Sequence, residues 1–264
     1  MIFEKPSLRT HVSFDMGINK LGGHALYLGQ QNGKLGERER VSDYAKNLSC
    51  YADAIVARVF ENSAIEGLAQ HASVPVINAL CNVYHPCQAL ADFVTLSEHF
   101  TDLSAVKLAY IGDGNNVSNS LMLMAATLGV NFTLVCPQGY GPDEGMLNKV
   151  NALIQKSGSR FTFTSDINAI GQQDAIYTDT WVSMGQEDEK EKRVKEFDGY
   201  IVDTKLMSYA QSDAIFLHCL PAYRGYEVSV EVFEGDQSKV FEEAENRLHA
   251  QKGVMVWLDG KRND

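Results

Sequence analysis

The chain has 264 residues, of which 45% are hydrophobic, and it carries a formal net charge of -11 at pH 7. A chain of this length can bury one large core or two ordinary ones, and α/β proteins commonly divide at this size, so we expect two domains. The negative charge argues against binding to the nucleic-acid backbone, and an anionic ligand would require a local basic pocket.

The first ten residues lack the charged start and apolar run of a signal peptide, and no segment approaches the roughly 20 apolar residues of a membrane span. Five cysteines without C-x-x-C spacing fit neither a disulfide scaffold nor a zinc site. We therefore expect a soluble cytoplasmic protein that holds no metal and contacts no membrane. The cysteines that we expect to be small core residues are Cys50, Cys81, Cys87 and Cys136.

Short apolar runs alternate with segments of helical periodicity. The expected strands are residues 1–3, 54–59, 76–79, 107–111, 131–135, 160–164, 175–178 and 215–217. The expected helices are marked by the stripe Leu8, Val12 and Met16, by the stripe Leu90, Phe93, Val94 and Leu96, and by residues 118–128, 143–156, 187–197 and 241–258.

This alternation predicts two doubly wound α/β domains, each with a central parallel sheet flanked by helices. We expect one domain over residues 1–99, joined by a closing helix at about 241–264, and the other over residues 100–240. The charge run within residues 187–197 is interpreted as a solvated helix face. In this fold class ligands bind outside the carboxyl ends of the strands.

The run PSLRTH, Pro6 to His11, opens the first expected helix. Ser7 and Thr10 supply hydroxyls and Arg9 a planar set of donors, beside helical amides that have no internal partner. This combination predicts an anion site, most naturally for phosphate. A simple N-cap at Ser7 is the alternative.

Arg58 ends the apolar strand AIVARVF, where burial of a guanidinium is costly unless an anion or another acceptor receives it. A structural ion pair is the alternative. In HPCQ, His85 and Gln88 can point to one side of a helix start and donate hydrogen bonds to a carbonyl oxygen and hold an amino group. A histidine satisfied within a loop is the alternative there.

The turn GDGNN, which ends at Asn116, follows a strand, but it lacks the third glycine of a dinucleotide fingerprint. Its asparagines suit a zwitterionic amino acid, or they form a plain turn. DTWVSMG supplies a carboxylate at Asp179 and a hydroxyl at Ser183, and HCLP exposes Cys219 at a strand end. Arg247 lies on the last expected helix, where an ion pair with Glu243 is the simplest explanation.

The runs FEKPSLRT, HPCQALAD, DTWVSMG, HCLPAYRG and EAENRLHAQK resemble, in this order, those of ornithine carbamoyltransferases, and the resemblance covers essentially the whole chain. It implies transfer of a carbamoyl group from carbamoyl phosphate to the δ-amine of L-ornithine, in a homotrimer with sites shared between neighbouring subunits and without a metal or organic cofactor. It does not distinguish arginine synthesis from arginine breakdown.

The resemblance also implies roles for individual residues. Those that would bind carbamoyl phosphate are Ser7, Leu8, Arg9, Thr10, Lys34, Arg58, His85, Gln88, Cys219, Leu220 and Arg247, with Lys34 reaching the neighbour's phosphate. Those that would bind ornithine are Asn116, Asp179, Ser183 and Met184. The catalytic set would be Arg9, Arg58, His85 and Cys219.

The chain departs from the family's usual pattern at three points. It starts inside the first strand, without the preceding helix, Leu8 stands where threonine is usual, and His11 stands where arginine is usual. Because of Leu8, a carbamoyltransferase that acts on N-acylornithine, putrescine or another amine remains an alternative. The three departures together leave a second alternative, a catalytically silent assembly subunit. A nucleotide-dependent oxidoreductase is supported only by the turn from Gly112 to Asn116.

Overall fold

A computed structural model describes residues 1–182 and 186–261, which form two compact units. One unit comprises Met1–Ala91 together with the chain from Arg247 onward, and the other comprises Asp92–Asn246. Helices α4 (Pro86–His99) and α10 (Val240–Lys261) each contain a boundary between the units.

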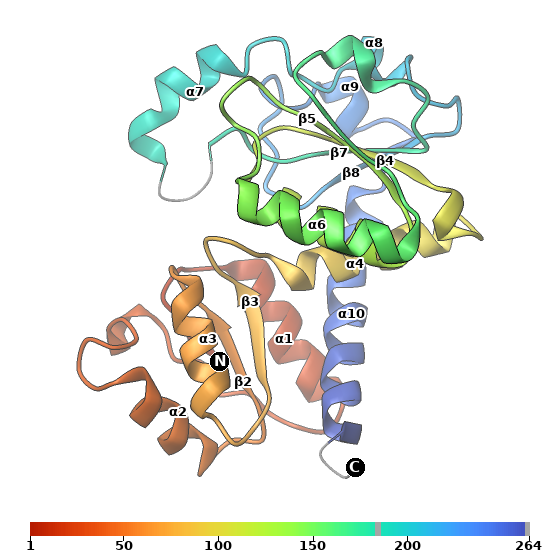
Figure 1. The fold of residues 1–264 in the computed structure, drawn as a ribbon. Helices are drawn as coiled ribbons and strands as arrows, with labels where there is room; N and C mark the ends of the chain where they lie inside the picture. The colour runs from red at the N-terminus through yellow and green to blue at the C-terminus, as the bar shows by residue number, and fades with distance from the viewer. Residues whose placement is uncertain (183–185, 262–264) are drawn as a thin grey trace. The chain divides into compact units, whose positions relative to one another are not determined.

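The Met1–Ala91 unit is built on a three-stranded parallel sheet, in the order β1-β2-β3. Its strands are β1 (Ile2–Phe3), β2 (Ile55–Arg58) and β3 (Val76–Leu80), and its remaining helices are α1 (Leu8–Lys20), α2 (Val41–Ser49) and α3 (Asn62–His71), with a short 3-10 turn, η1 (Gln30–Asn32). Figure 1 shows α2 and α3 beside this sheet.

Strand β2 is buried on both faces, and its side chains alternate between two cores. Ile55 and Ala57 pack with Leu68 of α3, whereas Val56 packs with Phe14 of α1 on the other face. Met255 of α10 joins that second core. Helices therefore cover both faces, as expected of a parallel sheet.

Helix α1 buries a different face from the one that its apolar stripe suggests. Leu8, Val12 and Met16 are 78%, 48% and 46% exposed. The buried residues of α1 are Thr10, Phe14 and Gly17. A Cβ atom on Gly17 would lie 3.3 Å from Cε of Met255, so the absence of a side chain permits close packing against α10.

The Asp92–Asn246 unit contains a five-stranded parallel sheet, in the order β6-β5-β4-β7-β8. The strands are β4 (Lys107–Ile111), β5 (Asn131–Val135), β6 (Phe161–Thr164), β7 (Ala175–Thr178) and β8 (Ile215–His218). The chain adds strands on one side of β4 and then, from β7, on the other. The carboxyl ends of β4 and β7 therefore form a topological switch point, where ligands bind in such sheets.

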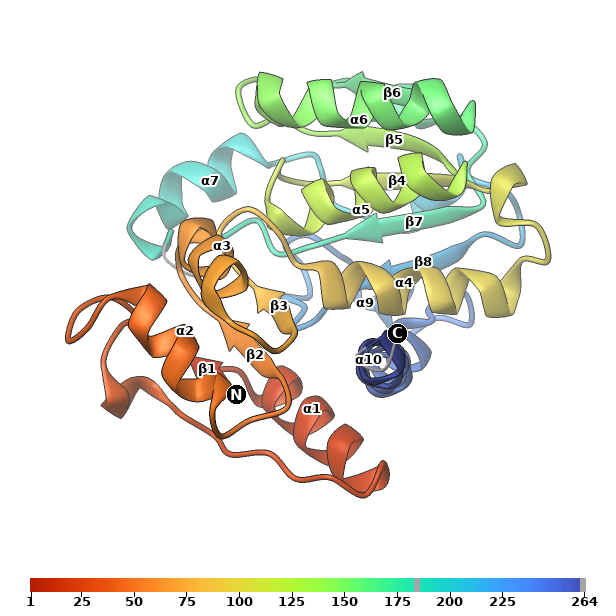
Figure 2. The ribbon, with the colours of Figure 1, turned by 60° about the horizontal axis from the view of Figure 1, so that its bottom comes forward.

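The helices of this unit are α5 (Asn116–Leu128), α6 (Glu144–Ser157), α7 (Lys190–Glu196), α8 (Thr204–Met207) and α9 (Val230–Phe233), with 3-10 turns η2 (Leu103–Ala105), η3 (Ile167–Ile170) and η4 (Glu187–Glu189). Figure 2 shows α5 and α6 alongside the strands. Leu206 of α8 and Val232 of α9 share another core with Ile111 and Phe216 of the sheet. The predicted α/β class, two parallel sheets flanked by helices, is confirmed.

Three of the four cysteines expected in the core are buried, whereas Cys50 is exposed at the end of α2. Among the described residues, no helix combines the length and the apolar character needed to cross a membrane.

Candidate functional site

Arg58 is a buried cation at the carboxyl end of β2, 5% exposed. The ion pair that would make it structural is not formed, because none of the salt bridges in residues 1–182 and 186–261 includes Arg58. Burial, and then the charge of Arg247, lowers the pKa of Arg58 to about 10. A guanidinium in this state is ready to receive an anion.

Arg247 lies in the same unit as Arg58 and is also 5% exposed. Its Nη1 donates to Oε1 of Gln88 at 2.6 Å, and its Nη2 donates to Oγ1 of Thr10 at 3.4 Å. The alternative ion pair with Glu243 is absent from the salt bridges of the described chain. Gln88 of α4 and Thr10 of α1 therefore hold the guanidinium of Arg247, which lies on α10.

His85 precedes Pro86, the first residue of α4, and is 7% exposed. Burial, followed by the charges of Arg247 and Arg58, lowers its pKa well below the usual value. The imidazole is thus neutral at neutral pH and can donate one N–H to a carbonyl oxygen. Two cations and a neutral imidazole lie near one another in this unit, an arrangement suited to a ligand that carries both a phosphate and a carbonyl group.

The start of α1 contributes unequally to this cluster. Oγ of Ser7 accepts from the backbone N–H of Thr10 at 3.3 Å, so Ser7 caps the N-terminus of α1. Thr10 is buried, but Leu8 and Arg9 are exposed. The structure therefore brings together Thr10, Arg58, His85, Gln88 and Arg247, and leaves Leu8 and Arg9 outside this buried group.

Lys34 lies near Phe60, with its Nζ 5.3 Å from the ring centroid, and Lys5 lies on the same ring at 4.4 Å. Burial, and then the charge of Arg58, lowers the pKa of Lys5. Glu4 holds the loop of Lys34, because its carboxylate accepts from the backbone N–H groups of Leu35 and Phe60, both at 2.8 Å. Sequence reasoning missed Lys5 and Glu4, although both stand within the run FEKPSLRT.

The predicted residues of the other unit gather at the carboxyl ends of β4, β7 and β8. Oδ2 of Asp179 accepts from Nδ2 of Asn115 at 2.9 Å, and its Oδ1 accepts from Sγ of Cys219 at 3.1 Å. Asn116, the predicted residue, is half-buried at the start of α5, and its neighbour Asn115 makes the contact and caps that helix. Ser183 and Met184 lie outside the described residues.

Cys219 is a thiol rather than a thiolate. Burial, and then the charge and hydrogen bond of Asp179, raises its pKa well above the usual value. Leu220 follows with a φ of 57°, and its backbone N–H donates to Nδ1 of His218 at 2.9 Å. Cys219 can thus orient a neighbouring group by hydrogen bonding, but it is a poor acceptor for a proton.

Comparison with protein families covers both units. Residues 1–98 match the carbamoyl-P binding domain of aspartate/ornithine carbamoyltransferase, and residues 104–258 match its Asp/Orn binding domain.

The chain belongs to the aspartate/ornithine carbamoyltransferase family.

Among relatives in this family, the ornithine carbamoyltransferase of Shewanella oneidensis is 57% identical over 258 residues, which are 98% of this chain and 85% of that protein. The ornithine carbamoyltransferase of a Vibrio species is 51% identical over 257 residues, with 97% and 85% covered. The solved structure of ornithine carbamoyltransferase from Pyrococcus furiosus has a TM-score of 0.94 and 47% identity, and the match covers 97% of this chain and 82% of that one.

In this family member, one group of side chains has the spacing of metal ligands: Asp179, His218 and Cys219 lie within 4.8 Å of one another. Both nitrogens of His218 are engaged, however, Nδ1 with the backbone N–H of Leu220 and Nε2 with Glu227 at 3.2 Å. The Cys219 thiol is protonated, whereas a metal needs a thiolate. The donor set therefore suits a hydrogen-bond network better than a metal ion.

The charge run within residues 187–197 was expected to be a solvated helix face, and Arg193 shows that this interpretation is wrong in part. It is 3% exposed, pairs with Asp113 beyond β4, and donates from Nε to the backbone oxygen of Trp181 at 2.6 Å. The run is therefore not solvated throughout. Its partner Asp113 lies 80 residues away in the sequence, so local patterning gave no sign of the pair.

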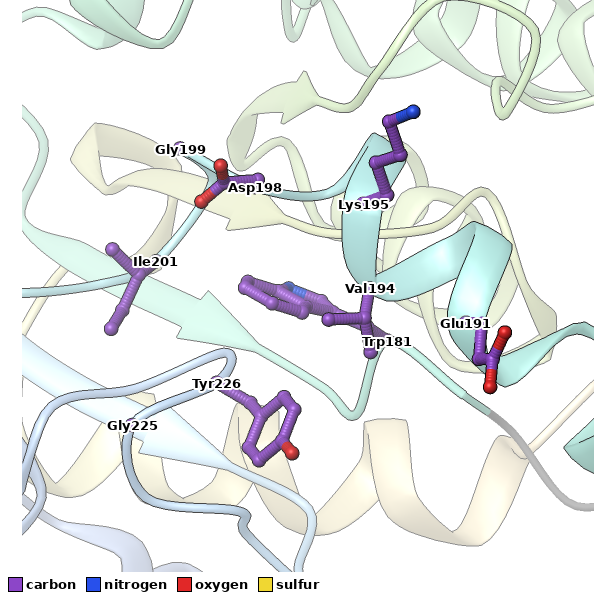
Figure 3. Close-up of a pocket in the computed structure, with 9 residues that line it drawn as sticks. All are labelled: Trp181, Glu191, Val194, Lys195, Asp198, Gly199, Ile201, Gly225 and Tyr226. Carbon is purple, nitrogen blue, oxygen red and sulfur yellow. The ribbon is translucent and has the colours of Figure 1, made fainter.

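A separate pocket of about 340 Å³ lies beside Trp181, Val194 and Tyr226 (Figure 3). The rings of Trp181 and Tyr226 stand edge to face with centroids 6.2 Å apart. The site residues that the family resemblance implies do not line this pocket, so we do not assign it to either substrate.

Proposed function

We propose that this chain transfers the carbamoyl group of carbamoyl phosphate to the δ-amine of L-ornithine, giving L-citrulline and phosphate. The observation that carries the proposal is the buried pair Arg58 and Arg247 beside the neutral His85, with no salt bridge to either arginine in the described residues. The names of the relatives, ornithine carbamoyltransferase, support the choice of substrates.

In this proposal the Met1–Ala91 unit binds carbamoyl phosphate. Arg247 and the start of α1, with Ser7, Leu8, Arg9 and Thr10, hold the phosphate. The carbonyl oxygen receives hydrogen bonds from Arg58 and His85, and Gln88 holds the carbamoyl amino group. Cys219 and Leu220 of the other unit also bind carbamoyl phosphate, as the family resemblance implies.

The Asp92–Asn246 unit binds ornithine. Asp179 receives the α-amino group, and Asn116, Ser183 and Met184 complete the amino-acid site. Because the pKa of Cys219 is raised, its thiol orients the δ-amine rather than taking its proton.

The reaction follows from these placements. The neutral δ-amine attacks the carbamoyl carbon and forms the new C–N bond, while negative charge grows on the carbonyl oxygen. The C–O bond to phosphate then breaks, and the proton lost by the amine leaves on the phosphate. Removal of one donor to such an oxyanion typically costs roughly 10² to 10³ in rate.

The proposal extends to assembly and setting. The active form is a homotrimer in which Lys34 reaches the phosphate bound by the neighbouring subunit, and the enzyme serves arginine metabolism in the cytoplasm. The cation-binding surface of Phe60 supports an ordered position for Lys34. Light scattering of the purified protein distinguishes a trimer from a monomer.

The direct test is formation of citrulline from carbamoyl phosphate and ornithine, with phosphate released in equal amount. Putrescine and N-acetylornithine are tested as competing amines, because a relative of known structure, an acetylornithine transcarbamylase, is 30% identical with a TM-score of 0.86. Faster carbamoylation of either amine than of ornithine would overturn the substrate assignment. Binding of N-phosphonacetyl-ornithine without any turnover would instead favour a silent assembly subunit.

A further inference from the structure

Glu243, in the first turn of α10, joins the ends of two strands of the Asp92–Asn246 unit. It is 1% exposed. Its Oε2 accepts from the backbone N–H of His218 at 2.8 Å, and its Oε1 accepts from the hydroxyl of Tyr177 at 3.3 Å. His218 ends β8 immediately before Cys219, and Tyr177 lies on β7 two residues before Asp179.

A second carboxyl group, that of Asp92 on α4, is hydrogen-bonded to Glu243 and is 0% exposed. Two ionised carboxylates in contact at such a site would repel each other and would both lose hydration. A single proton between them removes the repulsion and supplies the hydrogen bond. Burial, and then the charge and hydrogen bond of Asp92, raises the pKa of Glu243 well above the usual value.

Arg247 lies one turn farther along α10, where its guanidinium donates to Gln88 and Thr10. The groups at the ends of β7 and β8 that act on this pair are acidic or neutral. They are the Tyr177 hydroxyl on β7, the Cys219 thiol after β8 and, bonded to that thiol, the Asp179 carboxylate. Burial raises the pKa of Tyr177 first, and the charges of Asp92 and Glu243 raise it further, so the hydroxyl stays a donor. An ionised Glu243 would add a further negative charge beside the carboxyl groups of Asp92 and Asp179.

The turn beyond β8 needs such an anchor. Leu220 adopts a φ of 57°, a left-handed conformation that costs a residue other than glycine about 1 to 3 kcal/mol and persists only where its surroundings enforce it. The His218 backbone is held by Glu243 through its N–H, and the His218 ring holds the N–H of Leu220. Glu243 is thus the carboxyl end of a chain of contacts that leads to Cys219 and Leu220.

We propose that Glu243 and Asp92 share one proton, and that this pair is a positioning element that fixes the His218–Leu220 turn for carbamoyl transfer. Glu243 acts through the turn and touches no substrate. This inference rests on the proposed function for its effect on rate, but the proton itself can be detected independently of activity.

The test compares Glu243→Gln with Glu243→Ala. Glutamine keeps an oxygen for the His218 N–H and supplies an N–H that replaces the shared proton toward Asp92, so we expect citrulline formation at pH 7 within about threefold of the native protein. Alanine leaves the His218 N–H buried without an acceptor, so we expect kcat to fall about tenfold or more while KM for carbamoyl phosphate changes little. The matched control is Glu245→Gln, an exposed site two residues along the same helix, which should behave as the native protein.

The pH profile gives a readout that a merely structural role would not produce. As pH rises through the raised pKa of Glu243, the native protein loses the shared proton, and its activity should decline, whereas Glu243→Gln has no such proton and should stay active to higher pH. If Glu243→Gln at pH 7 loses as much activity as Glu243→Ala while melting like the native protein, Glu243 is required as an anion and the proposal is overturned.

Infrared spectroscopy separates this inference from the proposed function. The native protein should show the band of a protonated carboxyl at neutral pH, and Glu243→Gln should lack it, whether or not citrulline is formed. The measurement also decides the matter if Glu243→Ala does not fold. Identical carboxyl bands in the two proteins would overturn the shared proton even in a fully active enzyme, whereas no citrulline from the native protein would overturn only the proposed function.

Discussion

Arg58 shows how a single residue can serve function at a cost to stability. Its side chain ends an otherwise apolar buried strand and forms no salt bridge within the described residues. The lowered pKa, to about 10, reflects the free energy spent in keeping a guanidinium away from water and near Arg247. Such a cost in stability is typical of buried charged residues that bind a ligand.

Replacement of Arg58 by methionine should therefore raise stability and remove activity. We expect a gain of about 1 kcal/mol in the free energy of unfolding, because an apolar side chain of similar length needs no counter-ion. The rate of citrulline formation should fall by roughly 10² or more. Urea unfolding and the citrulline assay measure the two effects, with Arg160→Met, an exposed arginine, as the control. A destabilised Arg58→Met protein would show that the guanidinium is structural.

His85 predicts a dependence of stability on pH. Its folded-state pKa lies well below the usual 6.5, so on acidification through about 6.5 the unfolded chain binds a proton that the folded chain does not. Below a pH of about 6.5, this group should lower the free energy of unfolding by about 1.4 kcal/mol for each unit by which the pH falls. Between pH 7 and pH 5.5 the free energy of unfolding should decline less in His85→Gln than in the native protein. In His24→Gln, a change at an exposed position, it should decline as much as in the native protein. Equal declines in the native protein and His85→Gln would contradict a neutral buried imidazole.

At the scale of elements, the strands were the most predictable feature. The expected runs 107–111, 131–135 and 175–178 coincide with β4, β5 and β7, because a strand buried in a parallel sheet is a continuous apolar run. Helices α2 and α3 were not predicted.

The buried face of α1 was not predictable from apolar residues alone, because Thr10 and Gly17 are buried for reasons other than hydrophobicity. Thr10 contacts Arg247, and Gly17 permits close approach to Met255. Both partners lie more than 200 residues away in the sequence, and local periodicity carries no information on them.

Arg193 gives a prediction about how elements are joined. It ties α7 to Asp113 beyond β4 and to the backbone of Trp181. Arg193→Met leaves Asp113 buried without its partner and should cost about 3 to 5 kcal/mol of stability. Adding Asp113→Asn should restore much of that loss, because a neutral amide tolerates burial better than a carboxylate. Denaturant unfolding of the single and double variants tests this pair, and additive losses would contradict it.

At the scale of the whole molecule, each unit holds the side chains that we propose for one substrate. The Met1–Ala91 unit carries Arg58, His85 and Arg247, and the Asp92–Asn246 unit carries Asp179 and Cys219. The residues of each group could be named from sequence because five motifs in order identify the family. The sequence did not predict which of these residues are buried together, because burial depends on contacts between distant segments.

Binding should therefore be ordered. In the proposed reaction the δ-amine, which is protonated in free ornithine at neutral pH, must approach the carbamoyl group that Arg58 binds, and cations there would disfavour it until an anion is bound. Calorimetry should detect ornithine binding only in the presence of phosphonoacetamide, a stable analogue of carbamoyl phosphate. Equal affinity of ornithine for the free protein would rule out this order.

The most direct test of the account is calorimetric titration of carbamoyl phosphate into the native protein and into Arg247→Met. We predict saturable binding to the native protein and a loss of about tenfold or more in affinity in the variant, since a buried charge-assisted contact with phosphate contributes about 1.5 to 3 kcal/mol. Equal affinity in the two proteins would contradict the assignment of this cationic cluster as the phosphate site.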